Sequence, residues 1–315
     1  MSLGAKFGVA GIALALLVIA SGGWYVYKRP LSVYAWFNRR TLASAGLGEA
    51  TAATGFGPQA YWSGGSGPTL VLLHGAGDQS GTWANVVERL TGTYRLVIPD
   101  LAGHGRSAPA QGPIELDQVL RGVESILSQG PQDPAIIVGN SLGAWIGLLY
   151  AHAHPDRVAR LVLVNGGALR GDRPDLSLTP RTRAEAAALM KELRDPGSDP
   201  IRDFVLDDVV REAQSGPLAR FAATAARMEP YLLDGRLHEV RVSVDLIWGE
   251  SDRLFTLDYA RRMMAALPAS RLRTLPACGH VPHQECPARF GAALTDVLAS
   301  PPPMPVMKNA RRGPT

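Results

Sequence analysis

The segment Ala135–Trp145 constrains the fold of this chain more than any other stretch. A short apolar run ends at the pentapeptide Gly-Asn-Ser-Leu-Gly (residues 139–143), and an apolar helical pattern follows at once. This motif between a strand and a helix predicts a sharp turn that exposes its central serine. Gly139 and Gly143 are expected where the two backbones approach too closely for a Cβ atom. The unpaired N–H groups of the new helix would then point toward Ser141, which we predict to be a nucleophile.

Short apolar strands alternate with helical segments around this turn. The alternation predicts βαβ units and a parallel sheet covered by helices on both faces. Ligands of such sheets bind beyond the carboxyl ends of the strands. The expected strands are 69–73, 94–98, 135–138, 158–164, 242–248 and 271–275, with weak edge strands in 51–67, and the expected helices are 82–90, 114–129, 142–154, 256–267 and 286–299.

The alternation is interrupted between residues 166 and 241. This stretch reads as helices punctuated by Pro and Gly, and we interpret it as a helical lid inserted after the sixth strand, over the carboxyl edge of the sheet. The folded domain is expected to span residues 55–300. The tail, residues 301–315, has no periodicity and is predicted to be disordered. The lid helices are expected at about 181–194, 199–214, 217–228 and 231–239.

The N-terminus contains 21 residues without a charge, residues 7–27. As a helix they would be about 30 Å long, which is the thickness of the hydrocarbon core of a bilayer. Aromatic residues and Lys28-Arg29 follow at the end of this segment, as at a membrane interface. We therefore predict a single-pass anchor within residues 1–29 rather than a cleaved secretory signal. More basic residues follow the span than precede it, which predicts a catalytic domain on the cytoplasmic side.

Residues 30–54 are expected to form either a juxtamembrane linker or an interfacial helix, because they mix aromatic residues with Arg39 and Arg40. The chain of 315 residues is 46% apolar and 19% charged, which is typical of a globular protein. Its excess of basic residues lies at the two ends, and the body between them is slightly acidic. This distribution argues against nucleic-acid binding and suits a membrane surface.

Two cysteines, Cys278 and Cys286, exclude a disulfide framework and a multi-cysteine metal site. They could pair, but we expect two free thiols.

A serine nucleophile needs a histidine base and a carboxylate that orients the base. In a strand–serine–helix architecture the expected chain order is serine, acid, histidine. Asp252 follows the strand predicted at 242–248, and His280 follows the next strand. Parallel strands end at the same edge of a sheet, so we predict that Ser141, Asp252 and His280 form the catalytic group.

Other carboxylates are less well placed for the role of the acid. Glu250 sits earlier on the same turn, where the chain has barely left the strand. Asp245 lies inside the strand, and Asp258 falls on the following helix. Asp252 is therefore preferred.

Other histidines have simpler roles. His283 leads into the helix that follows, whereas Gly279 frees the backbone just before His280. His152 and His154 fall on the helix after Ser141, where surface or capping roles are expected. Asp100 and His104 could form a second acid–base pair, but a tight turn rich in local hydrogen bonds is the preferred interpretation.

The tetrahedral intermediate of acyl transfer carries a negative charge that two backbone N–H groups are expected to meet. One is the N–H of Leu142, just after the nucleophile. The other should come from the loop after the first buried strand, His-Gly-Ala-Gly at 74–77, where we choose Ala76. No metal or organic cofactor is needed.

Five motifs in this order and spacing resemble those of the α/β-hydrolase family over roughly residues 55–300. They are His-Gly-Ala-Gly, Asp-x-x-Gly-His-Gly-x-Ser, Gly-Asn-Ser-Leu-Gly, Trp-Gly-x-x-Asp and Gly-His-x-x-His. The resemblance implies a mostly parallel central sheet with flanking helices and a lid. It also implies a Ser141 nucleophile, an Asp252 acid, a His280 base, and oxyanion donors at Ala76 and Leu142.

The resemblance to branches of the family suggests the substrate. A serine nucleophile argues against the branches that resemble haloalkane dehalogenases and epoxide hydrolases, which use Asp. The Gly-Asn-Ser sequence is similar to that of carbon–carbon bond hydrolases of meta-cleavage products, although Val281 stands where those place an aromatic residue. The anchor together with the serine looks more like the membrane-bound, monoacylglycerol-lipase-like branch.

We therefore expect a serine hydrolase of carboxylic esters, with lipid-like or acylglycerol esters as substrates. Carbon–carbon bond hydrolysis is the alternative within enzymes. A catalytically silent hydrolase fold used for binding is a third possibility, against which the intact Ser, Asp and His argue. The sequence does not determine the oligomeric state.

Overall fold

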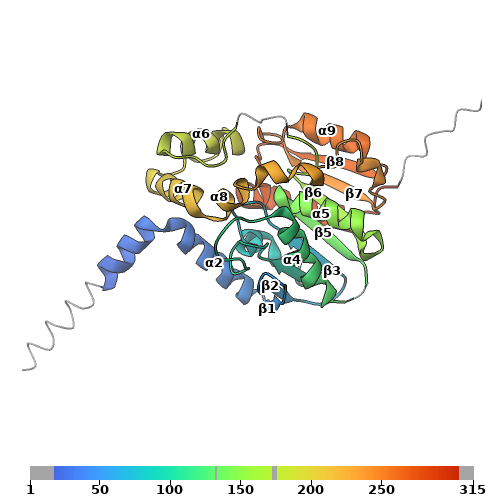
Figure 1. Ribbon diagram of the computed structural model, residues 1–315, viewed down its shortest axis with the longest axis horizontal. Coiled ribbons are helices and arrows are strands. Elements are labelled where there is room, and N and C mark those ends of the chain that lie inside the picture. The colour runs from blue at the N-terminus through green and yellow to red at the C-terminus, as the bar shows by residue number, and fades with distance from the viewer. Residues whose placement is uncertain (1–17, 132, 172–175, 305–315) are drawn as a thin grey trace, which may run out of the picture.

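The computed structural model describes residues 18–131, 133–171 and 176–304 and is built around an eight-stranded sheet (Figure 1). The strand order is β1-β2-β4-β3-β5-β6-β7-β8; β2 is antiparallel to both neighbours and the other pairs are parallel. The predicted mostly parallel sheet is thus confirmed. The strands are β1 (Gly48–Ala52), β2 (Gln59–Gly64), β3 (Thr69–Leu73), β4 (Arg95–Pro99), β5 (Ala135–Asn140), β6 (Val158–Val164), β7 (Val244–Gly249) and β8 (Ser270–Leu275).

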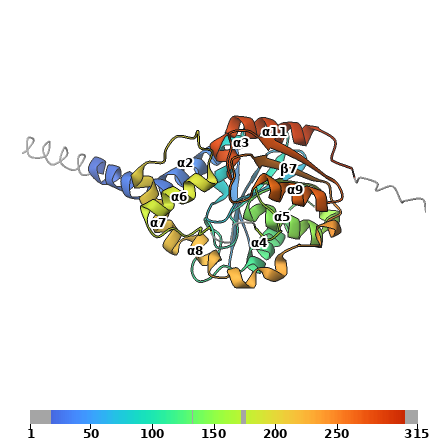
Figure 2. The ribbon, with the colours of Figure 1, turned by 90° about the horizontal axis from the view of Figure 1, so that it is seen from above.

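Helices cover both faces of the sheet because alternate residues of its buried strands point to opposite sides. Leu73 packs with one set of helices, whereas its neighbour Leu72 packs with the other. The first set is α4 (Leu116–Ser128), α5 (Leu142–Ala153) and α9 (Leu257–Ala266), and the second is α2 (Pro30–Ser44), α3 (Ala84–Val87) and α11 (Pro287–Ala299) (Figure 2).

The helix expected at 82–90 is much shorter in the structure. It consists of a 3₁₀ turn, Ser80–Trp83, followed by the single α-helical turn α3. Beyond α3, the amides of Arg89 and Leu90 donate to carbonyls three residues back, so the chain tightens into turns instead of continuing the helix.

A helical insertion follows β6, as predicted, and lies beside the carboxyl edge of the sheet (Figure 1). Its α-helices are α6 (Arg183–Leu193), α7 (Asp203–Ser215) and α8 (Pro217–Ala222). The helix expected at 217–228 ends early, because the Thr224 hydroxyl donates to the carbonyls of Ile114 and Phe221 and fixes a turn there. Short 3₁₀ turns at Ala225–Arg227, Glu229–Tyr231 and Leu237–Glu239 complete the insertion.

The N-terminal segment packs on the domain from Tyr27 onward, where the Tyr27 ring stacks on Phe204 of α7. Residues 18–28 are helical and α2 follows, with Leu42 buried and Arg39 paired to the buried Asp100 at 3.2 Å. The range 30–54, expected to be a linker or interfacial helix, therefore holds a packed helix and also β1, which pairs with β2.

The predicted anchor is described only in part. Its residues 7–17 lie outside the described residues, as do residues 305–315 of the predicted disordered tail. Across the described ranges 18–131, 133–171 and 176–304, the helices all lack the combination of length and apolar character that crossing a bilayer requires.

Candidate active site

Ser141 occupies the turn between β5 and α5 in a strained backbone conformation, with φ 53° and ψ −115°. A Cβ atom on Gly139 would overlap the backbone of Gly143, and one on Gly143 would overlap the carbonyl of Leu73. Gly166, after β6, packs just as closely on the Ser141 backbone. The close approach predicted for this turn is confirmed, and strain of this kind is typical of functional sites.

Asp252 and His280 meet at the carboxyl ends of β7 and β8. Nδ1 of His280 lies 2.8 Å from Oδ2 of Asp252, and both side chains are buried. The other carboxylate oxygen, Oδ1, accepts backbone N–H groups from Leu254 at 2.9 Å and Phe255 at 3.0 Å. Both carboxylate oxygens therefore act as acceptors, which fixes the side chain and orients the imidazole with its Nδ1 toward Asp252.

Asn165 is a third partner of the carboxylate, and sequence reasoning did not single it out. Its Nδ2 donates to Oδ2 of Asp252 at 2.8 Å, and its Oδ1 accepts the N–H of Gly249 at 2.9 Å. It is buried, with φ 45°, directly after β6. The available signal was an asparagine at the end of a buried strand, where a polar side chain faces the catalytic edge of the sheet.

Asn140, the residue before the nucleophile, links two elements of the site. Its Nδ2 donates to the carbonyl of Val164 at 3.1 Å and to the carbonyl of His280 at 3.0 Å. The backbone of the predicted base is thus attached to the turn that carries the predicted nucleophile.

Ser141 and His280 line the same cavity of about 250 Å³. In the described part of the chain their side chains are not hydrogen-bonded to each other. Ala76 lines the same cavity, and Leu142 begins α5 beside it. Among the described residues, neither backbone N–H donates to a protein acceptor, which leaves both available for an oxyanion.

His74 shapes the loop that carries Ala76. Its Nε2 accepts the N–H of Leu101 at 2.9 Å, so the ring proton resides on Nδ1 and faces the Gly75 carbonyl at 2.8 Å. Burial lowers the pKa of His74, which keeps the ring neutral in this arrangement.

The alternative carboxylates are engaged elsewhere. Asp245 is buried in an ion pair with Arg160, and Asp258 pairs with Arg261 on the surface of α9. Glu250, on the turn after β7, is exposed.

The alternative histidines have structural partners. His283 stacks on Trp83 with ring centroids 4.1 Å apart, and burial lowers its pKa to about 3. Burial also lowers the pKa of His104 to about 3, and its Nδ1 lies 3.0 Å from the carbonyl of Ala102. His152 and His154 pair with glutamates, at 3.5 and 2.9 Å.

The expectation of two free thiols is wrong. Cys278 and Cys286 form a disulfide, with Cα atoms 5.9 Å apart. The short helix α10 (Pro282–Glu285) turns the chain back on itself between them, which brings the two side chains together. The disulfide closes a loop that contains His280.

Aliphatic side chains form most of the cavity wall. They come from the helical insertion, from the loop after Asp252, and from Leu31 at the start of α2. Glu212 is the one carboxylate among the lining residues. The insertion lining comprises Leu178, Leu189, Met190, Leu193, Val209, Ala213, Pro217 and Leu218.

A serine on a strained strand–helix turn, with a histidine–aspartate pair at neighbouring strand ends of a mostly parallel sheet, defines an α/β hydrolase. Residues 70–293 match the model of the alpha/beta hydrolase family, and the chain belongs to that family.

Several known proteins similar to this chain are hydrolases. A pimeloyl-[acyl-carrier protein] methyl ester esterase of Aromatoleum aromaticum is 32% identical over 251 residues, covering 73% of this chain and 98% of the esterase. A 2-hydroxy-6-oxo-6-phenylhexa-2,4-dienoate hydrolase of Burkholderia cepacia is 24% identical over 259 residues, covering 75% of this chain and 89% of that hydrolase. The crystal structure of a membrane phospholipase A matches with a TM-score of 0.75 and 25% identity, covering 93% of this chain and 98% of that chain.

Proposed function

We propose that this protein is a serine hydrolase that cleaves carboxylic esters whose acyl chain occupies the cavity above Ser141. The observation that carries the proposal is the aliphatic lining of the cavity that Ser141 and His280 share. Burial of apolar surface supplies about 0.8 kcal/mol per CH₂ group, so each methylene of an acyl chain strengthens binding.

The proposed reaction has two halves. Ser141 Oγ attacks the ester carbonyl while Nε2 of His280 takes its proton, and the N–H groups of Ala76 and Leu142 receive the oxyanion. Collapse expels the alcohol, which leaves with the proton from His280. Water then attacks the acyl-enzyme, again losing a proton to His280, and releases the carboxylic acid and free Ser141.

We further propose that residues 7–27 anchor the enzyme in a membrane and that its substrates are lipid-like esters. The apolar segment, the contribution of Leu31 to the cavity and the similarity to a membrane phospholipase A support this. The disulfide Cys278–Cys286 favours an oxidising compartment, opposite to the cytoplasmic side that the distribution of basic residues predicts. Protease accessibility of the domain in intact cells distinguishes the two orientations.

A fluorophosphonate probe tests the proposed ester chemistry. We expect labelling of the parent protein and loss of labelling in Ser141→Ala and His280→Ala. A parent that is folded but not labelled would contradict the proposal and favour a binding role. p-Nitrophenyl esters of graded chain length test the acyl cavity, and activity confined to acetate would argue against a long acyl chain.

Carbon–carbon bond hydrolysis is the second candidate. It is favoured by Asn140 in the nucleophile turn and by the similarity to the Burkholderia cepacia hydrolase. The loss of absorbance of a meta-cleavage product, measured beside ester hydrolysis with the same preparation, decides between the two reactions.

A further inference from the structure

The last turn of α6 in the insertion contacts both loops that carry the predicted acid and base. The N–H of Arg253, next to Asp252, donates to the carbonyl of Glu192 at 3.0 Å, and the N–H of His280 donates to the carbonyl of Leu193 at 2.7 Å. The last carbonyls of a helix have no partner within it. Here two consecutive carbonyls, those of Glu192 and Leu193, accept hydrogen bonds from the loops that carry the predicted acid and base.

The contact with the base loop is backbone against backbone. A Cβ atom on Gly279 would overlap the carbonyl of Leu193. The position of His280 is therefore sensitive to the position of the end of α6, because no side chain lies between them to absorb a shift.

Glu285 also joins the loop that carries His280 to the segment that follows α6. Its Oε2 accepts the N–H of Gly279 at 2.5 Å, and its Oε1 accepts the N–H of Asp195 at 2.9 Å and the hydroxyl of Ser198 at 2.5 Å. The Nε of Arg194 lies 3.8 Å from Oε1, and the Glu285 side chain is only 8% exposed. A carboxylate this buried requires such donors, and it receives them from the base loop and from the insertion alike.

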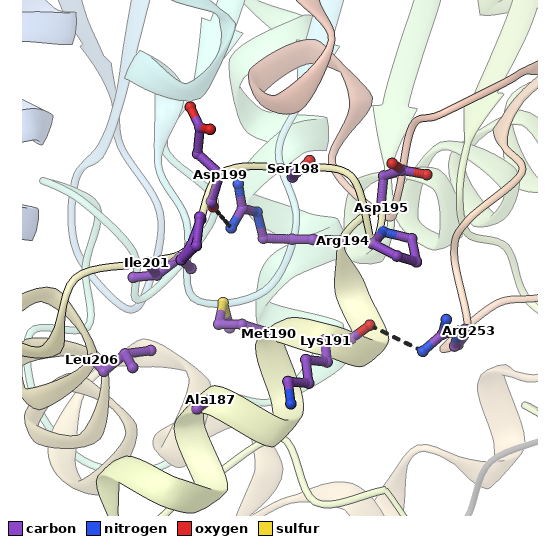
Figure 3. Close-up of a pocket in the computed structure, with 12 residues that line it drawn as sticks. Ala187, Met190, Lys191, Arg194, Asp195, Ser198, Asp199, Ile201, Leu206 and Arg253 are labelled. Atoms are coloured by element: carbon purple, nitrogen blue, oxygen red, sulfur yellow. Dashed lines mark hydrogen bonds between the residues drawn. The ribbon is translucent and has the colours of Figure 1, made fainter.

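The segment that Glu285 holds continues into the wall of a second hollow of about 380 Å³ (Figure 3). Asp195 and Ser198 lie on the loop after α6 there, and Arg253 reaches back to the carbonyl of Lys191 at 3.4 Å. One side of this loop borders the hollow. The loop is therefore held to the domain by the contacts on its other side, among them those of Glu285.

We propose that Glu285 is a positioning residue, which sets the place of His280 relative to Asp252 by joining the base loop to the insertion; this role rests on the proposed hydrolase function. An ionised carboxylate accepts on both oxygens, whereas a glutamine offers one acceptor and an NH₂ group. In Glu285→Gln that NH₂ group faces either the N–H of Gly279 or the donors of Asp195 and Ser198. The hydrogen bonds of Glu285 to the base loop or those to the insertion must then be lost.

The test compares Glu285→Gln, Ser198→Ala and the double variant with the full-length parent. Asp199→Asn is the matched control, because Asp199 is exposed on the same loop. Turnover of a p-nitrophenyl ester is divided by the number of sites that a fluorophosphonate titrates, so unfolded protein is not counted. Amide hydrogen exchange is measured over residues 190–200 and 278–286.

We expect kcat per titrated site to fall about tenfold in Glu285→Gln, because one buried donor is left without its acceptor. The KM should change by less than about threefold, because Glu285 does not line the cavity. Exchange should rise in both segments together and stay unchanged in the central strands. The double variant should lose less than the product of the two single losses, because both act at one junction.

Parent-like turnover per site in Glu285→Gln, or exchange that rises in only one of the two segments, would overturn the positioning role. If Glu285→Gln does not fold, Ser198→Ala carries the same test. A parent that hydrolyses no ester would refute the proposed function, whereas the exchange experiment would still report on the junction.

Discussion

Asn165 Nδ2 and His280 Nδ1 both lie 2.8 Å from the same carboxylate oxygen, Oδ2 of Asp252. The two groups approach the aspartate from the two strands that flank β7, Asn165 from the end of β6 and His280 from the end of β8. The carboxylate is therefore held between them, and its direction toward the imidazole depends on a residue that does not line the cavity.

Replacing Asn165 by Ala should lower kcat/KM about tenfold, because Asp252 loses one charge-assisted hydrogen bond and the Gly249 N–H loses its acceptor. Ester hydrolysis per titrated site measures this, with the exposed Asn85→Ala as the control. In an Asp252→Ala background the same substitution should have almost no further effect on turnover. A full additional loss there would show that Asn165 acts through something other than Asp252.

Gly139→Ala should destabilise the domain by about 3 kcal/mol or prevent folding, because the new Cβ would overlap the Gly143 backbone and neither backbone can retreat. Urea unfolding measures the change. Gly92→Ala is the matched control, since a Cβ atom there meets nothing within 4 Å. Equal stabilities of the two variants would refute the close approach at the turn.

The tight turn at Ser141 and the contact between Asp252 and His280 could be predicted because each depends on local signals at strand ends. Asn165 could not, because its role requires knowing that β6 and β7 are neighbours and that its side chain turns toward Asp252. Glu285 depends in addition on the path of the insertion, which no periodicity in the sequence fixes.

The disulfide was predicted wrongly and the role of α2 was left open, because both depend on contacts that local sequence does not reveal. A spacing of eight residues between Cys278 and Cys286 does not reveal that α10 folds the chain back between them. The residues of α2 suggested either a linker or a lipid-facing helix, and the ion pair of Arg39 with the buried Asp100 is a tertiary contact. The anchor at residues 7–27 stays a prediction.

Removing the disulfide with Cys278→Ser and Cys286→Ser together should lower the free energy of unfolding by about 2.5 kcal/mol, the loop-closure entropy for a separation of eight residues. Urea unfolding of the parent with and without reductant should show the same difference. The double variant should not respond to reductant. Thiols that can be alkylated in the folded, unreduced parent would contradict the disulfide.

The stability of the domain should fall as the pH is lowered from 6.5 toward 3, and His283 should contribute to that fall. Burial lowers its pKa from the ordinary 6.5 to about 3, so between these values the unfolded chain binds a proton that the folded domain excludes. Because the unfolded state binds more protons, the free energy of unfolding rises with pH in this window, by up to about 1.4 kcal/mol per unit for one such histidine.

His283→Gln should therefore flatten the pH dependence between pH 6.5 and pH 3 even if it lowers stability at pH 7, where its stacking on Trp83 and its contact with Thr82 are lost. His104 and His74, whose pKa values burial lowers in the same direction, keep a remaining slope. Urea unfolding at pH 7, 6 and 5 measures both slopes, with the exposed His238→Gln as the control. An unchanged slope in His283→Gln would mean that His283 already accepts a proton in the folded domain, which its burial against Trp83 should prevent.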